Sequence, residues 1–226
     1  MLNHDLPEIV KYLKGREVEV IINSNGTLLT PDWQEKLIES GLDQYRCSID
    51  GAKDETYARI RGANLLPKLK QGLGGLVNAK ERLGAKQPLI SIWCVATREN
   101  LQELPDLLRL AAQLGVPEVY MQRLVYFARE PEKQYGMARD ELTFFGKDEN
   151  DEDRIIEECT VLSHQLGINF LASGGRDPIN SLAAARPSDF TPWQACMRPC
   201  CAGPAISLCF WRKRTLGNAN RRCRTE

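Results

Sequence analysis

The feature that most constrains this chain is a regular alternation of strand-like and helix-like segments over residues 2–172. Short β-branched or apolar runs, typical of strands, occupy residues 17–24, 44–49, 88–97, 118–127 and 168–172. The intervening segments carry apolar residues three or four positions apart, as in Trp33, Leu37 and Ile38. Strands that alternate with helices at this spacing run parallel, because each helix is the crossover between two neighbouring strands. We therefore expect an α/β fold with four or five parallel strands.

Helix boundaries follow from local signals. Thr30-Pro31 is expected to begin one helix, and a second is expected over residues 67–83. A third is expected to begin with Asn100 and Glu103 as a capping box, whereas residues 50–64 are expected to form a loop.

The periodicity fits either a complete doubly wound sheet or part of a barrel. In both cases ligands bind beyond the carboxyl ends of the strands. The polar residues at those ends are the candidate site residues: Asn23, Asn25, Ser48, Asp50, Thr97, Arg98, Gln122 and Arg123.

Charge and hydropathy exclude several classes of partner. Thirty basic and thirty acidic residues give a net charge of zero, so we expect no nucleic acid or membrane partner. No run approaches the roughly 18 apolar residues of a membrane span, and the first residues lack the apolar core of a signal peptide. We therefore expect a cytoplasmic protein.

The eight cysteines are unevenly distributed. Cys47, Cys94 and Cys159 lie in apolar segments and are expected to be small buried hydrophobic residues. The other five are Cys196, Cys200, Cys201, Cys209 and Cys223. In a reducing compartment, cysteines are expected to serve metal binding, catalysis or core packing rather than disulfides. A four-thiolate zinc site built from Cys196, Cys200, Cys209 and Cys223 is possible by count but has no recognised spacing.

The segment INSNGTLLTPDWQEKLIESGLDQYRCSIDGAKDETYARIRG resembles the middle of a radical S-adenosylmethionine (radical SAM) enzyme, and VATRENLQELPDLLRLAAQLGVPEVYMQRL continues the likeness. LCFWRKRTLGNAN is similar to the first part of a SPASM extension, an auxiliary iron–sulfur module. The resemblance implies three regions. Residues 1–172 would be a partial (β/α)6-type barrel, 173–192 a linker, and 193–226 an incomplete SPASM-like segment.

The resemblance also implies cofactors and site residues. The family holds a [4Fe–4S] cluster with a CxxxCxxC loop and cleaves SAM reductively, but this chain contains no CxxxCxxC. We therefore expect a protein truncated at both ends that does not cleave SAM alone. Ser48, Asp50, Asn25 and Arg61 would contact SAM, with a turn role open for Asp50 and Asn25 and solvation open for Arg61. Cys196 and Cys209 would be ligands of an auxiliary cluster.

The implied activity is radical modification of a peptide or small-molecule substrate. The alternative is a non-enzymatic, thiol-rich metal-binding or interaction protein. Because the first two strands of the family barrel would precede residue 1, we also expect self-association through an unpaired sheet edge.

Overall fold

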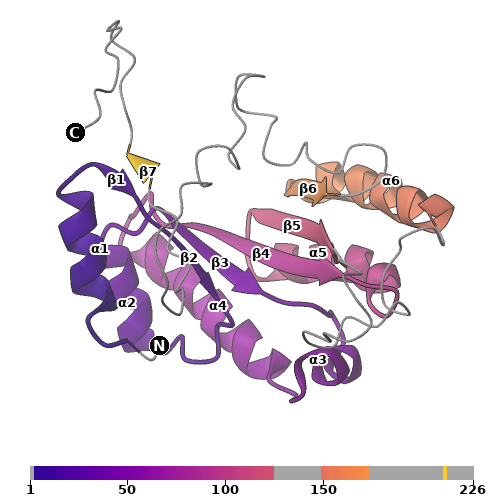
Figure 1. Cartoon of the computed structure of the whole chain (residues 1–226), viewed down its shortest axis with the longest axis horizontal. Helices are drawn as coiled ribbons and strands as arrows, with labels where there is room; N and C mark the ends of the chain where they lie inside the picture. Colours follow the sequence, from indigo (N-terminus) through magenta and orange to yellow (C-terminus); the bar gives the residue numbers. More distant parts are fainter. Residues whose placement is uncertain (1–2, 125–148, 174–210, 213–226) are drawn as a thin grey trace, which may run out of the picture.

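A computed structural model describes residues 3–124, 149–173 and 211–212. Strands and helices alternate along it as the sequence predicts (Figure 1). The strands are β1 (Val18–Glu19), β2 (Ile21–Ser24), β3 (Gln44–Ser48), β4 (Leu89–Ala96), β5 (Glu118–Arg123), β6 (Asn169–Ser173) and β7 (Trp211–Arg212). The helices are α1 (Leu6–Lys14), α2 (Pro31–Glu39), α3 (Asp54–Arg61), α4 (Leu66–Arg82), the short 3₁₀ helix η1 (Leu101–Glu103), α5 (Leu104–Gln113) and α6 (Glu149–Leu166).

Five of the strands form one parallel sheet in the order β2-β3-β4-β5-β6. Each strand lies next to its predecessor along the chain, which is the order that repeated βα units with one crossover direction produce. The α/β class and the parallel sheet are therefore confirmed. A separate antiparallel pair joins β1 to β7.

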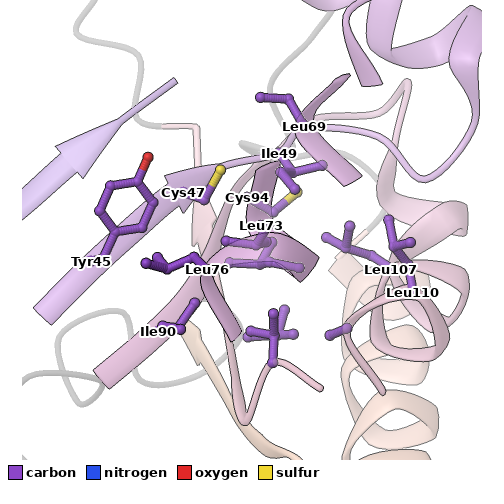
Figure 2. Close-up of a cluster of buried hydrophobic side chains, with 14 of the residues drawn as sticks. Tyr45, Cys47, Ile49, Leu69, Leu73, Leu76, Ile90, Cys94, Leu107 and Leu110 are labelled. Atoms are coloured by element: carbon purple, nitrogen blue, oxygen red, sulfur yellow. The ribbon is translucent and has the colours of Figure 1, made fainter. Parts of the chain in front are cut away.

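The two faces of the sheet differ in chemistry. One face is apolar and packs against the helices, as Figure 2 shows for strand residues Tyr45, Cys47 and Ile90 beside Leu73 and Leu76 of α4. The opposite face carries polar and aromatic side chains, because successive strand residues point to opposite sides. We call this second face the polar face; its residues include Asn23, Arg46, Ser48, Trp93, Tyr120 and Gln122.

The cysteines of the described residues lie in the apolar core. Cys47, Cys94 and Cys159 are at most 2% exposed and form no disulfide. The expectation that they are small buried hydrophobic residues is confirmed.

One predicted loop is a helix. Residues 50–64 contain α3, with Asp54 and Glu55 in its first turn, Arg59 and Arg61 in its last, and Gly62 in the left-handed conformation at its C-cap. These charges favour a helix through its dipole, and glycine is the common residue at such a C-cap. The loop prediction was therefore wrong.

Residues 174–210 and 213–226 lie outside the described residues. The expected linker from residue 174 onward and the cysteine-rich segment other than Trp211–Arg212 fall there, Cys196 and Cys209 included. In the part of the chain that the structure does describe, no helix is both long enough and apolar enough to cross a membrane.

Candidate functional site

A pocket opens where the central strands end on the polar face. It has a volume of about 230 Å³ and is lined by Asn23, Ser48, Trp93, Cys94, Val95 and Gln122. These residues come from β2, β3, β4 and β5, so four strands supply one site. Asn23, Ser48 and Gln122 were among the strand-end residues selected from the sequence. Ser48 is also one of the four expected SAM contacts.

The other three expected SAM contacts have protein partners. Asn25 is exposed, and its side-chain oxygen accepts hydrogen bonds from the backbone N–H of Thr27 at 3.3 Å and from its hydroxyl at 3.0 Å. Asp50 and Arg61 form an ion pair, with 2.5 Å between Arg61 Nε and Asp50 Oδ2. The structure therefore places these three side chains in turns and ion pairs beside the pocket rather than in its lining.

Asp50 joins the ends of two strands. It is 3% exposed, and its second carboxylate oxygen accepts a hydrogen bond of 2.8 Å from the backbone N–H of Val95 in β4. Both oxygens thus have partners, one from β4 and one from α3. A buried carboxylate is stable only with such partners.

Asn100 strengthens the same junction. Its amide nitrogen donates to the carbonyl of Asp50 at 2.8 Å and to that of Val95 at 2.9 Å. Its oxygen accepts from the backbone N–H of Thr97 at 2.7 Å. One buried amide therefore links the loop after β3 to the loop after β4, which fixes the edge of the pocket near Ser48.

The expected capping box is absent, because Glu103 contacts a different helix. Its side chain accepts hydrogen bonds from the backbone N–H groups of Ala52 at 3.0 Å and Lys53 at 3.2 Å, and from the hydroxyl of Thr56 at 2.6 Å. These groups lie at the start of α3. Glu103 therefore stabilises the N-terminus of α3, where a negative charge is favourable, and the prediction of a reciprocal contact with Asn100 was wrong.

A row of side chains across the polar face was not predicted from the sequence. The guanidinium carbon of Arg46 lies 4.2 Å from the centroid of the Trp93 ring, and Trp93 packs against Tyr120 with 4.1 Å between ring centroids. Trp93 also donates a hydrogen bond of 3.0 Å to Ser91. The strand alternation already placed Arg46 on the same face as Ser48, and this was the signal available in the sequence.

The cysteines of the described residues do not meet the requirements of an iron–sulfur cluster. Cys47, Cys94 and Cys159 lie on three separate elements, and burial is the main cause of the raised pKa of each thiol, whereas clusters need thiolates. Within residues 3–124, 149–173 and 211–212, no three His, Cys, Asp or Glu side chains gather as a metal site would require. These residues therefore do not fit a cluster.

The family model of the radical SAM superfamily matches residues 1–134. This chain belongs to that superfamily. The match includes β2 to β5 and all the residues of the pocket, so the candidate site lies within the family domain.

Curated relatives are similar in sequence to part of this radical SAM chain. It is 30% identical over 118 residues to a tungsten-containing aldehyde ferredoxin oxidoreductase cofactor-modifying protein of Pyrococcus furiosus, covering 52% of this chain and 33% of the relative. It is 32% identical over 111 residues to a mycofactocin maturase of Mycolicibacterium smegmatis, covering 49% and 27%. The chain thus spans about a third of the length of these relatives.

Solved structures support the fold. Streptococcus suis SuiB matches with a TM-score of 0.59 at 14% identity, covering 76% of this chain and 36% of that one. SuiB bound to its precursor peptide SuiA matches with a TM-score of 0.57 at 14% identity, covering 80% and 37%. At such low identity the likeness concerns the fold alone.

Proposed function

We propose that this chain supplies the SAM-facing part of a radical SAM barrel whose activity is the modification of a peptide or small metabolite. The observation that carries the proposal is the position of the pocket, which lies at the carboxyl ends of four parallel strands inside the family domain. The peptide alternative is supported by the solved complex of SuiB with the precursor peptide SuiA. The Pyrococcus relative, whose name describes cofactor modification, supports the small-metabolite alternative.

The pocket fits the polar part of a nucleoside. The hydroxyl of Ser48 and the amides of Asn23 and Gln122 can both donate and accept hydrogen bonds, as ribose and amino-acid groups require. When bound, SAM supplies the adenosyl group used in the family reaction. Ser48 would bind it directly, whereas the Asp50–Arg61 pair would hold the loop after β3 in place.

Saturation-transfer difference NMR with SAM tests this assignment. We expect signals from the ribose protons with the wild-type chain and a loss of affinity of about fivefold in Ser48→Ala, the equivalent of about 1 kcal/mol for one hydrogen bond. Ser40→Ala is the matched control, because the Ser40 hydroxyl donates to the carbonyl of Leu37 in α2. No SAM signal, or equal losses in both variants, would contradict the proposal.

We expect the chain by itself to form no 5′-deoxyadenosine from SAM. The sequence contains no CxxxCxxC loop, so it lacks the three thiolates that bind the cluster of this family. The measurement is an anaerobic assay with iron, sulfide, dithionite and SAM, read by chromatography. Product above a no-protein control would show this expectation to be wrong.

We further propose that Cys196 and Cys209 ligate an auxiliary iron–sulfur cluster, with further ligands from other cysteines or another chain. The support is the similarity of LCFWRKRTLGNAN to a SPASM extension. A double Cys196→Ala, Cys209→Ala variant is then expected to lose the bound iron and its visible absorbance after reconstitution. Full retention of both would contradict the assignment, with Cys47→Ala as the control for loss of an unrelated thiol.

A further inference from the structure

Arg46, Trp93 and Tyr120 form a row of stacked side chains on the polar face. The guanidinium of Arg46 is held in position by two neighbours. The ring of Trp93 supports the guanidinium of Arg46 from one face, at 4.2 Å. Gln44 holds its side edge, because Gln44 Oε1 accepts from Arg46 Nε at 3.3 Å and from Nη2 at 2.9 Å. A guanidinium stacked on an aromatic ring and bonded along one edge has lost most of its freedom, so it can bind a ligand at little further entropic cost.

The remaining edge of this guanidinium has donors to spare. The hydrogen bonds to Gln44 use the single N–H of Nε and one N–H of Nη2, which leaves the other N–H of Nη2 and both of Nη1. Among the described residues no carboxylate forms a salt bridge with Arg46. The N–H groups of Nη1 and Nη2 along this end edge have the geometry that binds both oxygens of a carboxylate.

The nearby acids are committed to other groups. Glu19 accepts a hydrogen bond of 3.3 Å from Gln44, and Glu118 accepts one of 2.9 Å from Asn169. Burial lowers the pKa of Arg46, and the charges of Glu118 and Glu19 oppose that change. The guanidinium therefore stays charged at neutral pH, because an arginine titrates far above it.

Arg46 also lies within reach of the pocket. It precedes Ser48 by two residues on the same face of β3, a separation of about 6–7 Å along a strand. Trp93 connects the pocket to Arg46, because it lines the pocket and its ring also stacks against the guanidinium. A substrate bound over the polar face beside SAM would therefore need only one short side chain to reach the free edge of the guanidinium.

We propose that Arg46 binds a carboxylate group of the substrate through its Nη1 and Nη2 edge, and that Gln44 and Trp93 position it for this role. The inference rests on the proposed function, since it names the substrate class of the same site. A peptide carboxylate and the carboxylate of a small aromatic metabolite present the same chemistry, and the two arms of the test separate these sources.

The experiment measures binding of neutral and charged probes to the full chain by saturation-transfer difference NMR. In the peptide arm, acetyl-Ala-Glu-Ala-amide is compared with its Gln counterpart. In the small-molecule arm, 3-phenylpropionate is compared with 3-phenylpropionamide. We expect the wild-type chain to prefer the carboxylate in at least one arm, and Arg46→Gln to lose that preference by about tenfold.

Two further variants make the result decisive. Arg82→Gln is the control, because Arg82 is exposed on α4 and pairs with Glu35 at 2.6 Å, so the same charge is lost away from the polar face. Arg46→Lys keeps the charge without the planar edge, and we expect its carboxylate preference to lie between those of wild type and Arg46→Gln. If Arg46→Gln does not fold, the Arg46→Lys result decides the question.

The proposal is overturned if neither arm shows a carboxylate preference, if the preference survives in Arg46→Gln, if Arg46→Lys matches the wild type, or if Arg82→Gln shows the same loss. None of these measurements requires SAM or an iron–sulfur cluster. SAM binding, recorded separately for the same samples, reports on the proposed function, so failure of one inference is distinguishable from failure of the other.

Discussion

At the scale of single residues, Gly26 is the position where backbone and packing set the strictest limit. It follows β2 in the Ser-Asn-Gly turn and has a φ of 69°, in the left-handed region. A Cβ at this position would lie 2.8 Å from Cys47 Sγ and 2.8 Å from Leu69 Cδ2. The turn therefore has room only for glycine. Its close approach to Cys47 and Leu69 packs the end of β2 against β3 and α4.

Comparing Gly26→Ala with Gly62→Ala separates the cost of a positive φ from the cost of crowding the core. Gly62 has a φ of 81°, but a Cβ added there would meet nothing within 4 Å, so Gly62→Ala carries the conformational cost alone, about 1–2 kcal/mol. Gly26→Ala adds displacement of two core side chains, and we expect it to lower the free energy of unfolding by about 1–3 kcal/mol more. Urea unfolding of both variants measures the difference. Equal losses would show that the core yields to the added methyl group without cost.

The buried thiols are expected to make the folded state less stable at alkaline pH. Burial raises the pKa of Cys47 and of Cys159 from 9.0 to about 12. A raised pKa in the folded state means that the stabilisation is fully present below pH 9 and is lost as the pH rises from 9 toward 12, because the unfolded chain ionises first. Burial also raises the pKa of Tyr45, which acts in the same direction.

We therefore expect the free energy of unfolding to decrease as the pH is raised from about 9 to about 11. Urea unfolding at each pH measures it, and Cys47→Ala serves as the matched variant, in which the decrease is expected to be smaller. A stability independent of pH over this range, or an unchanged slope in Cys47→Ala, would contradict the assignment to buried thiols.

At the scale of elements, the junction between the loops after β3 and β4 depends on Glu103. Glu103 is 8% exposed, and its carboxylate accepts three hydrogen bonds from residues 52–56 at the start of α3. An amide in its place keeps the shape but loses the charge that strengthens these bonds. The start of α3 is therefore expected to be the part of the fold that depends most directly on this one side chain.

Glu103→Gln is expected to lower the free energy of unfolding by about 1–3 kcal/mol and to increase amide hydrogen exchange over residues 52–56. Glu99→Gln is the control, since Glu99 is partly exposed and pairs with Arg59 of α3 at 2.9 Å. The exposed pair is expected to contribute less than about 1 kcal/mol. An exchange increase of the same size in both variants would contradict a special role for Glu103.

The sequence predicted the order of elements better than the contacts between them. Periodicity located the five parallel strands, because burial on a sheet and on a helix leaves different repeats in the sequence. The helix α3 was missed because its signals are charges and a terminal glycine rather than an apolar stripe. Glu103 was assigned to the wrong helix because a capping box is a local pattern, whereas its partners lie some 50 residues away.

For the site, the sequence predicted part of the pocket lining but not the contacts between neighbouring side chains. Strand ends indicated Asn23, Ser48 and Gln122, which line the pocket, because the topology of parallel sheets brings such ends together. The stack of Arg46 on Trp93 was not predicted, because it joins residues of two strands on a diagonal, and one sequence does not give their relative register.

At the scale of the whole molecule, β2 is one of the two edge strands of the five-stranded sheet. β2 pairs with β3 on one side, and within the described part of the chain no strand pairs with its other side. No described strand takes up its backbone N–H and C=O groups on that side, and an unpaired strand edge favours edge-to-edge association. Ile21 and Ile22 are only half-buried there, which adds apolar surface.

We therefore expect the chain to self-associate as its concentration rises into the tens of micromolar, with β2 as the contact. Ile21→Lys places a charge on this edge and is expected to shift the equilibrium toward monomer, because strand edges that carry lysine resist pairing. Leu28→Lys is the control, since Leu28 is 41% exposed and lies in the turn beyond β2, so it removes exposed apolar surface without altering the strand. Sedimentation velocity over a concentration series measures the outcome. A monodisperse wild-type monomer would contradict the proposal, and equal shifts in the two variants would assign the association to exposed apolar surface in general rather than to the open edge of β2.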